Sequence, residues 1–521
     1  MKQSLFILLL LIGAPTYSQE TSTLILNNRA QQVFNEKQPI ADQGNGYYLN
    51  PVLPGNYGDP SIVRIDKDYY LAKSTGSGFI MFHSRDLVNW KPVIRHTFSG
   101  DYTRIWAVDL QYFNGKFYLY MPIDNYPGKK QSAFGNFVTI SEKPEGPWSE
   151  PVNLDLPVID KPGYSAIDPG FVQTPEGKKF LYVSNGYMIT LNNEGTKATS
   201  APKKVYEGWQ YPEEWNVECM CLESPKFFTR NGFYYLVSAE GGTSGPSTAH
   251  MTIVARSKSP EGPWINSPYN PLVRTYSIEE KWWHQGHGTI FEAADGSWWT
   301  IYHARLNDYT EIGRQVLLMP VDWTFDGWPV IKNSIPSSAL IPMPSGDNIG
   351  TGIPLSDDFS SELPGMQWEF AKGQGQKLRF GGSKLIMEAE GDSHRNGTQI
   401  SVGAVNISFE ATVEVSSSSP EAWGGIDLGT DGIMTNGVTS TFSEAAAWRL
   451  LGSEIPAGKD GRIFLKIKNL KKDISFYYSV DGETWISFGK GLRSNGSYSI
   501  RLFAWGKGEI VFRNFKYHGL E

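Results

Sequence analysis

Three acidic residues in the first half of the chain, Asp59, Asp168 and Glu223, each precede a short apolar segment. A carboxyl group acts as a general acid or a general base according to its surroundings. Where carboxyl groups crowd into one partly dry space, repulsion and desolvation raise the pKa of at least one of them. A protonated and an ionised carboxyl group then coexist at neutral pH, which is what paired acid–base catalysis requires.

An internal repeat provides the elements that would bring these acids together. Each unit starts with a polar residue, continues as a short apolar strand and a Gly, Asp or Lys turn, and ends in an aromatic strand. The leading polar residues recur roughly every 50–65 positions, and they are Asp59, Asp109, Asp168, Glu223 and His287. Blade-sized repeats of short strands, without convincing amphipathic helices between them, predict an all-β, five-bladed propeller rather than a doubly wound α/β fold.

The propeller geometry turns this repeat into a site prediction. The first strand of each blade lines the central channel, so the same end of every first strand faces one funnel. One acid alone is most simply a turn or cap residue, but three acids in register within a repeat favour a site. Cleavage of a glycosidic bond uses a pair of carboxyl groups of this kind.

The composition changes after Trp328, and residues 333–354 are rich in Ser, Pro and Gly. Such a segment reads as a linker or strap. Beyond it, alternating short strands without the blade repeat predict a β-sandwich, with a hairpin turn at Asp481-Gly482. We therefore expect a propeller catalytic domain over residues 20–335, a linker over 336–354 and an accessory β-sandwich domain over 355–521.

The N-terminus and the charge balance indicate where the protein works. Residues 1–19 combine Lys2, a short apolar run from Leu5 to Leu11 and small residues near Ser18, which is typical of a cleaved signal peptide. No later segment is long and apolar enough to span a membrane. The net charge is -7 without a basic stripe, which argues against nucleic acid as a partner. We expect a soluble protein exported to the periplasm or secreted.

The chain has two cysteines, Cys219 and Cys221. Two cysteines make no disulfide framework and are too few for a zinc site. A bridge between such close partners rarely reaches relaxed geometry. We therefore predict two buried thiols, with a Cys-x-Cys bridge as the alternative.

The motifs around the three acids resemble glycoside hydrolase family 43, which includes β-xylosidases, α-L-arabinofuranosidases, arabinanases and galactosidases. The resemblance covers most of residues 45–330, and its motifs are Gly58-Asp59-Pro60, Ile167-Asp168-Pro169 and Glu223-Ser224-Pro225. It implies that Asp59 is the general base, that Asp168 orients the acid and adjusts its pKa, and that Glu223 is the general acid. The implied mechanism inverts the anomeric centre, with base and acid roughly 6.5–9.5 Å apart.

The acid motif departs from the family pattern at one position. The family commonly has Glu-Gly-Pro, whereas this chain has Ser224 in the middle. Glu218, next to Cys219, is a competing acid, because a Glu-Cys pair resembles the related sucrose- and fructan-hydrolysing family. The Asn-Asp-Pro-Asn nucleophile motif of that family is absent, so we assign the acid to Glu223.

Four further residues are implied by their positions. Asp109 and Trp106 head the second blade and are candidates for substrate contacts, with a structural role as the alternative for Asp109. Arg314 resembles a family arginine that reaches the substrate or the base, although Gln315 replaces the usual Glu after it. His287 heads the fifth blade and resembles a channel histidine that contacts substrate or helps to hold a calcium ion or waters. A lone histidine is more often structural, and calcium prefers oxygen donors.

Other tryptophans are candidates for subsite walls or for blade packing, and these are Trp209, Trp215, Trp282 and Trp283. The region after the linker resembles the concanavalin-like sandwich that follows some family 43 propellers, on the motifs Asp357-Asp358-Phe359, Trp368 and Tyr478-Ser479-Val480-Asp481-Gly482. Its role, packing on the propeller or binding polysaccharide, stays open, as does the oligomeric state.

The resemblance implies an exo-acting, inverting hydrolase of plant polysaccharides or their oligosaccharides that needs no cofactor, beyond a calcium ion in a structural role. Release of xylose or arabinose is the leading expectation. Galactose-releasing activity, a galactanase and a non-catalytic carbohydrate-binding propeller are the alternatives, together with a sandwich lectin or adhesin that uses the propeller as scaffold. A non-catalytic propeller predicts the loss of a catalytic carboxylate, and all three are present.

Overall fold

A computed structural model describes residues 36–129, 134–157, 159, 164–370, 373–429, 431–435, 440–444, 447–449, 461–491 and 498–520. The predicted signal peptide, residues 1–19, lies outside these residues. The described regular structure is almost entirely strand, and its helical turns are η1 (Ser184–Gly186), η2 (Thr310–Ile312), η3 (Lys332–Ser334) and η4 (Gly375–Lys377). In the described part of the chain, no helix has the length and apolar character needed to cross a membrane.

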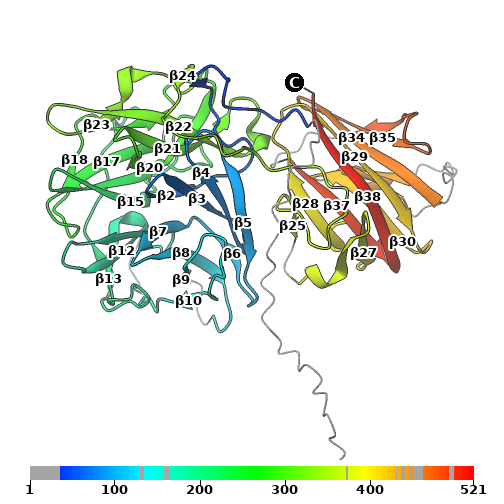
Figure 1. Ribbon diagram of the computed structural model, residues 1–521, viewed down its shortest axis with the longest axis horizontal. Coiled ribbons are helices and arrows are strands. Elements are labelled where there is room, and N and C mark those ends of the chain that lie inside the picture. The colour runs from blue at the N-terminus through cyan, green and yellow to red at the C-terminus, as the bar shows by residue number, and fades with distance from the viewer. Residues whose placement is uncertain are drawn as a thin grey trace, which may run out of the picture.

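Within the described residues, five antiparallel sheets form the blades of the propeller (Figure 1). The first two contain β2 (Ser61–Ile65), β3 (Asp68–Ser74), β4 (Gly78–Ser84) and β5 (Lys91–Thr97), and then β6 (Thr103–Ile105), β7 (Asp109–Phe113), β8 (Lys116–Asn125), β9 (Gly135–Ser141) and β10 (Val152–Asn153). The third contains β11 (Gly170–Gln173), β12 (Lys179–Val183), β13 (Tyr187–Leu191) and β14 (Lys203–Lys204).

The last two blades follow the same order. The fourth contains β15 (Glu223–Arg230), β16 (Phe233–Glu240), β17 (Met251–Ser257), β18 (Ile265–Asn266) and β19 (Val273–Arg274). The fifth contains β20 (Trp282–Glu292), β21 (Trp298–Leu306), β22 (Arg314–Trp323) and β23 (Pro329–Ile331). In each blade the apolar strand and the aromatic strand of the sequence repeat pair as neighbours, so the propeller prediction is confirmed.

Apolar side chains from adjacent blades pack face to face, and the chain closes its own ring. Met81 of β4 and Leu119 of β8 belong to one buried cluster between the first two blades. The segment before β2 hydrogen-bonds to the last blade: Val52 N–H donates to the Val316 carbonyl at 2.9 Å, and Val316 N–H donates to the Leu53 carbonyl at 3.1 Å. The N-terminal segment of the propeller is therefore hydrogen-bonded to β22 of its last blade, the strand that starts with Arg314.

Two seven-stranded antiparallel sheets make up the described part of the second half (Figure 1). One contains β25 (Glu369–Phe370), β28 (Thr398–Gly403), β37 (Ser499–Gly506), β30 (Ala422–Leu428), β31 (Asp431–Thr435), β32 (Ser440–Glu444) and β33 (Ala447–Arg449). The other contains β26 (Leu378–Gly381), β27 (Lys384–Ala389), β38 (Gly508–Gly519), β29 (Phe409–Ser417), β34 (Arg462–Leu470), β35 (Asp473–Ser479) and β36 (Ile486–Lys490).

Alternate residues of these strands point into one shared core, which gives the sandwich. On β34, Ile463, Leu465 and Ile467 are fully buried, while the residues between them are more exposed. The predicted hairpin around Asp481-Gly482 joins β35 to β36. The fold class, a propeller followed by a sandwich, is confirmed.

The segment between the two parts runs back along the propeller. Its β24 (Ile341–Pro342) pairs with β1 (Tyr47–Tyr48) near the start of the described chain. Gly352 N–H then donates to the Trp90 carbonyl at 2.8 Å. The linker is thus a strap held by backbone hydrogen bonds.

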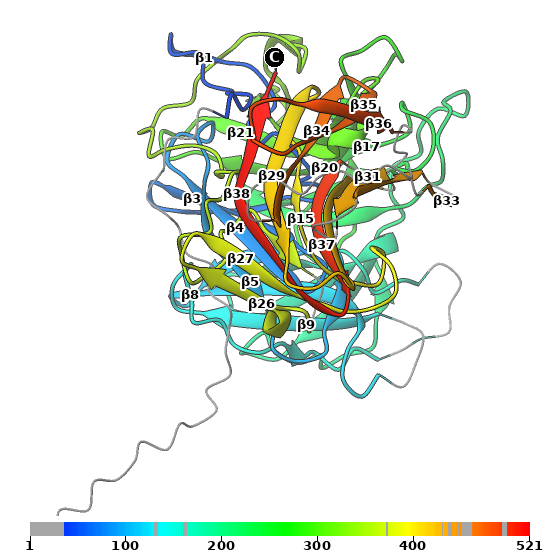
Figure 2. The ribbon, with the colours of Figure 1, turned by 90° about the vertical axis from the view of Figure 1, so that its right-hand side faces the viewer.

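Contacts of Arg95 and Glu311 with the sandwich show that it packs against the side of the propeller formed by the first and last blades. Figure 2 is viewed from the sandwich side, with the propeller behind. Ile312, in the loop before β22, is buried in the sandwich core, and Tyr498 N–H donates to the Glu311 carbonyl at 2.6 Å. Because Arg314 follows two residues after Ile312, this interface supports the loop that carries a predicted site residue.

Candidate active site

The three predicted acids lie at the same end of their blades. Asp59 lies two residues before the start of β2, Asp168 lies two residues before the start of β11, and Glu223 is the first residue of β15. Asp59 and Asp168 have positive φ angles, 59° and 52°, which non-glycine residues rarely adopt and which cluster at functional sites. The charges of Asp59 and Glu223 both raise the pKa of Asp168, and the charge of Asp59 raises that of Glu223, so the three carboxyl groups lie within electrostatic reach in one region.

Asp59 is held by one cation and two imidazoles. Arg314 Nη1 lies 2.6 Å from Asp59 Oδ1, His287 Nδ1 lies 3.2 Å from it and His303 Nδ1 lies 3.3 Å from it. Burial by itself raises the pKa of Asp59, but the opposing effects, led by the Arg314 guanidinium, hold that pKa well below its usual range. Asp59 is therefore ionised across the physiological pH range and is suited to accept a proton.

The histidines behind Asp59 are neutral, because burial keeps their pKa values low. The Asp59 backbone N–H donates to His303 Nδ1 at 3.1 Å, which requires the tautomer with its proton on Nε2. Burial lowers the pKa of His303 to about 4 and that of His287 to about 3. His250 is fully buried and stacks on His303 with ring centroids 5.2 Å apart. Arg314 is thus the charged partner in contact with Asp59.

Asp168 and Glu223 lie in the opposite electrostatic environment. Burial, followed by the negative charges of Glu223 and Asp59, raises the pKa of Asp168 well above its ordinary value. Burial and the charges of Asp59 and Glu218 raise the pKa of Glu223 to about 7, against the opposing effect of Arg314. A carboxyl group with a pKa near neutrality carries a proton that it can donate, as a general acid must.

The departure at Ser224 has a backbone explanation. Ser224 has a φ of 52° and is 1% exposed, and the pairing of β15 with β16 shifts register between Glu223 and Lys226. Glycine adopts this left-handed conformation without steric cost, which fits the glycine of the common family motif. Serine keeps the same bulge, so Glu223 retains its position at the strand start.

The competing acid Glu218 is occupied in its own loop. Its Oε2 accepts hydrogen bonds from the Ser244 N–H at 2.9 Å and the Gly245 N–H at 2.7 Å. It braces one loop against another, and it acts on Glu223 through its charge. These contacts favour Glu223 over Glu218 as the acid.

The prediction of two buried thiols is wrong. Cys219 and Cys221 form a disulfide, and both are only partly buried. Cys221 has a φ of 36°, and this turn of the backbone brings two side chains separated by one residue within bonding reach. Sequence spacing alone could not reveal that turn.

The prediction that Asp109 contacts substrate is wrong, because its carboxylate is buried and bonded within the protein. It is 1% exposed and lies 2.7 Å from the buried Lys226 Nζ. Its two oxygens also accept hydrogen bonds from Ser61 Oγ, Gln111 Nε2 and the Phe171 N–H. Four donors from four strands leave this carboxylate no capacity for a sugar, and it joins the first four blades around the channel.

The predicted aromatic walls divide into exposed and buried groups. Trp106 is 44% exposed, and its ring centroid lies 4.7 Å from that of Phe134. Its exposed face is available to a ligand. Trp282 is 1% exposed and packs in the core, so its candidacy as a wall is wrong. Trp209, Trp215 and Trp283 are partly exposed.

The residues next to Asp59 do not match a calcium site. Asp59, His287 and His303 offer one donor atom each within 4.8 Å of one another. Two of these donors are imidazole nitrogens, and the single oxygen donor already pairs with Arg314. Calcium takes six to eight oxygen ligands, so we include no metal ion in the chemistry below.

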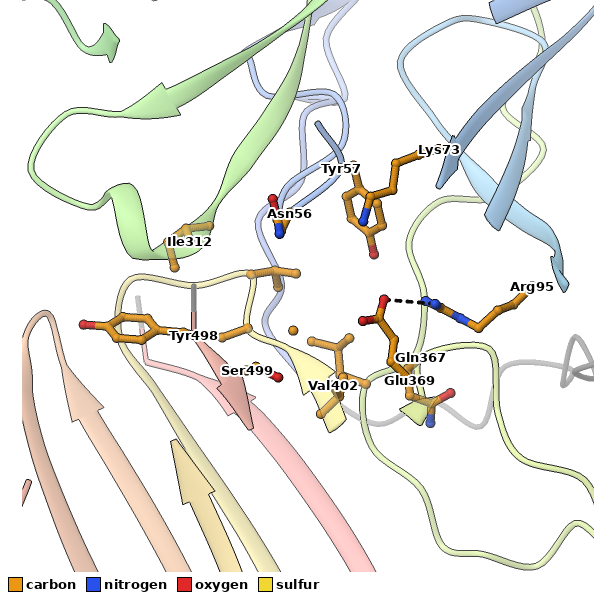
Figure 3. Close-up of a pocket in the computed structure, with 15 residues that line it drawn as sticks. Asn56, Tyr57, Lys73, Arg95, Ile312, Gln367, Glu369, Val402, Tyr498 and Ser499 are labelled. Atoms are coloured by element: carbon orange, nitrogen blue, oxygen red, sulfur yellow. Dashed lines mark hydrogen bonds and ion pairs between the residues drawn. The ribbon is translucent and has the colours of Figure 1, made fainter. Parts of the chain in front are cut away.

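A small cavity of about 90 Å³ lies between the propeller and the sandwich, and Figure 3 shows side chains that line it. Tyr57 and Lys73 of the propeller point into it, and Glu369 of the sandwich reaches in from the other side (Figure 3). Arg95, 6% exposed in its side chain, pairs with Glu369 at 2.9 Å. Tyr57, which lines the cavity, stands two residues before Asp59. Asn56, also in the lining, accepts the Arg314 backbone N–H on its Oδ1 at 3.1 Å. The sandwich therefore buttresses the wall that carries Asp59 and Arg314.

Sequence reasoning missed several residues of this region. Neither His303, which lies on β21, nor His250, which directly precedes β17, was singled out from the sequence. Glu240, at the end of β16, is fully buried, and burial raises its pKa to about 8. Its Oε1 accepts the Trp209 N–H at 2.7 Å. Spacing carries no signal for such residues, because they come from second and third strands.

The sequence profile of glycosyl hydrolases family 43 matches residues 48–329. The chain belongs to glycosyl hydrolases family 43. The family resemblance of the sequence is thereby confirmed.

Relatives extend the similarity in both sequence and structure. A non-reducing end α-L-arabinofuranosidase of Bacteroides ovatus is 31% identical over 354 residues, which are 62% of this chain and 61% of the relative's length. A xylan 1,3-β-xylosidase of a Vibrio species is 24% identical over 85% of this chain and 91% of its own. The crystal structure of the family 43 protein BlXynB from Bacillus licheniformis superposes with a TM-score of 0.78 at 26% identity, covering 91% of this chain and 100% of its own.

Proposed function

We propose that this protein hydrolyses glycosidic bonds in plant polysaccharides or their oligosaccharides by an inverting acid–base mechanism. The observation that carries the proposal is the contrast between Asp59, whose pKa is held well below its usual range, and Glu223, whose pKa is raised to about 7. At neutral pH this pair supplies an ionised base and a protonated acid in one site. Membership of family 43 supports the same reading.

In the proposed mechanism, Asp59 removes a proton from a water molecule as that water attacks the anomeric carbon. Glu223 donates its proton to the departing glycosidic oxygen. The C–O bond to the leaving sugar breaks while the C–O bond to water forms on the opposite face, which inverts the anomeric centre. One water is consumed, and the two carboxyl groups recover their protonation states by exchange with solvent. No cofactor enters this balance.

The neighbouring residues take supporting roles. Asp168 orients Glu223, and its own raised pKa reduces the repulsion between the two. Arg314 holds Asp59 in its ionised form and contacts the substrate through the part of its guanidinium that Asp59 leaves free. His287 is 3% exposed, so we assign it to the support of Asp59, and Trp106 forms a wall of the funnel.

We propose release of xylose or arabinose from the non-reducing end, as by a β-xylosidase or an α-L-arabinofuranosidase. The names of the relatives from Vibrio and Bacteroides ovatus support these two sugars. Galactose release is the alternative within the family. We further propose export after removal of residues 1–19, and the division into a catalytic propeller, a linker and an accessory sandwich with the boundaries predicted above.

A panel of nitrophenyl glycosides tests the function and identifies the sugar. Wild type should release nitrophenol from the β-xyloside or the α-L-arabinofuranoside, and proton NMR of the first-formed sugar should show the inverted anomer. Retention of configuration contradicts the mechanism. Binding of xylo-oligosaccharides without hydrolysis of any glycoside would instead support the non-catalytic propeller.

A further inference from the structure

Two loops on the rim of the fourth blade carry a group of aromatic side chains. We call Trp209, Trp215, Tyr276 and the arginine packed on them, Arg274, the aromatic ledge. Glu223 pairs with Ala239, Glu240 pairs with Met251, and Met251 pairs with Arg274. This chain of pairings places Arg274, on which the ledge is built, at the same end of the blade as Glu223 and three strands outward from it.

The ledge has a packed interior and one open ring. The Arg274 guanidinium lies 3.5 Å from the centroid of the Trp215 ring and 5.5 Å from that of Tyr276. Trp215 meets Trp209 and Tyr276 edge to face, at 5.9 and 6.4 Å. Arg274 is 7% exposed, whereas Tyr276 is 63% exposed. Arg274 and Trp215 therefore fix the ring of Tyr276 while solvent reaches it.

The loop that presents Tyr276 is tied down by hydrogen bonds. Glu280 Oε1 accepts the N–H groups of Tyr276 at 2.7 Å and Ser277 at 3.0 Å. The Trp283 indole N–H donates to the Ile278 carbonyl at 3.0 Å. An exposed aromatic ring held in one orientation binds a flat apolar surface with little further loss of entropy.

Part of the ledge shares a chain segment with the catalytic acid. Trp215 stands eight residues before Glu223 in the same segment, and Glu218 between them acts on the pKa of Glu223. A general acid protonates the oxygen of the leaving group, so the sugar that departs lies on the side of the acid. Tyr276 and Trp215 are thus placed to meet the saccharide that departs with the glycosidic oxygen, rather than the terminal sugar whose anomeric carbon is attacked.

We propose that the aromatic ledge binds the pyranose residues on the leaving-group side of the scissile bond, with Tyr276 as a stacking platform. This inference rests on the proposed function and deepens it. A β-linked pyranose presents a flat face of C–H groups that packs on an aromatic ring, and aromatic walls with few polar groups are typical of ligand sites. The substrate class is therefore a β-linked pyranose chain of several residues, such as a xylan main chain.

Two substrates that differ only in the leaving group test the ledge. β-Xylosyl fluoride has a single-atom leaving group, while xylotetraose places pyranose rings over the ledge. We expect Tyr276→Ala to lower kcat/KM for xylotetraose by roughly threefold to tenfold, mainly through KM, because an aromatic stacking contact contributes about that factor. Activity on the fluoride should stay unchanged. If arabinose is the sugar released, arabinofuranosyl fluoride and an arabinoxylo-oligosaccharide replace this pair.

Two controls separate stacking from other causes. Tyr276→Phe keeps the ring and should behave as wild type. Phe325→Ala removes a fully exposed ring from the turn between β22 and β23, at the opposite end of the last blade from Arg314, and should change neither substrate.

The proposal is overturned if Tyr276→Ala loses kcat/KM equally on both substrates, or if it loses none on xylotetraose. Wild-type dimers that Tyr276→Ala converts to monomers with unchanged kinetics would overturn it too, since the ledge would then be an interface between copies. A wild type that hydrolyses neither fluoride contradicts the proposed function itself, and the ledge proposal falls with it.

Discussion

The two sides of the funnel carry the same chemical group in opposite surroundings. On the side of the first and last blades, Asp59 touches Arg314 and two neutral histidines. On the side of the third and fourth blades, Asp168 and Glu223 face each other and Glu218, with no comparable cation in contact among the described residues. Neighbouring charges and burial, rather than residue type, therefore decide which carboxyl group gives up its proton.

Substitution of Asp59 or Glu223 should cause the largest loss of activity. We expect Asp59→Asn to lower kcat/KM by about 10²–10⁴ on every substrate, because the base is needed whatever departs. Glu223→Gln should cause a similar loss with oligosaccharides but a much smaller one with a glycosyl fluoride, whose leaving group needs no proton. Steady-state kinetics on both substrates check this.

Glu218→Gln is the matched control for that experiment, because it removes a nearby carboxylate that braces a loop. It should lower kcat/KM less than threefold. A loss as large as that of Glu223→Gln would transfer the role of acid to Glu218.

Removal of the cation should make the two sides more alike. Arg314→Met leaves Asp59 with burial but without its guanidinium, so the pKa of Asp59 should rise. We expect kcat/KM to fall roughly 10–100-fold, and the acid limb of its pH profile to move upward. The basic limb, which reports Glu223 near pH 7 in wild type, should move upward as well, because Arg314 lowers that pKa. An unmoved acid limb would contradict the proposed pairing.

Stability should respond with opposite signs on the two sides. The folded-state pKa of Asp59 is depressed, so its contribution is present above the unfolded value near 3.9 and is lost as pH falls through the folded value. Asp59→Asn should therefore destabilise the protein at pH 7 by about 1–3 kcal/mol. The folded-state pKa of Glu223 is raised, so wild type loses stability as pH rises from about 4.3 to about 7.

Glu223→Gln should accordingly gain stability relative to wild type above pH 7 and not at pH 4. Thermal unfolding of both variants at pH 4, 6 and 8 measures the two signs. Shifts of the same sign at pH 8 would mean that the two carboxyl groups do not differ as described.

The smallest effect concerns the backbone beside the acid. Ser224→Gly relieves a left-handed serine, so we expect stability to change by less than about 1 kcal/mol and in the favourable direction. Activity should be retained, since glycine keeps the bulge that holds Glu223. A tenfold loss of kcat/KM would show that the Ser224 side chain itself contributes to the site.

The part of the site that sequence predicted comes from a single structural rule. Asp59, Asp168 and Glu223 each lead the first strand of a blade, so the repeat places them at equivalent positions. The same rule also selected Asp109, and there it was misleading, because Lys226 and three other donors enclose that carboxylate. Position in a repeat predicts which end of the channel a residue occupies, but not what surrounds its side chain.

His303, His250 and Glu240 show the complementary limit. They lie on or next to the second and third strands of their blades, and packing brings His303 to Asp59, His250 onto His303 and Glu240 to the Trp209 backbone. The disulfide of Cys219 and Cys221 likewise depends on a local left-handed turn. Contacts of this kind join residues that no sequence period relates.

The sequence by itself determined the repeat, the all-β class, the change to a second β region and the three acids at the strand starts. These follow from local alternation and from a period, which are properties of neighbouring residues. Only the tertiary structure decided that Arg314 meets Asp59 across 255 positions, and that Asp168 and Glu223 are left to repel each other. Protonation depends on burial and on charges within a few ångströms, and those distances exist only once the blades have closed into a ring.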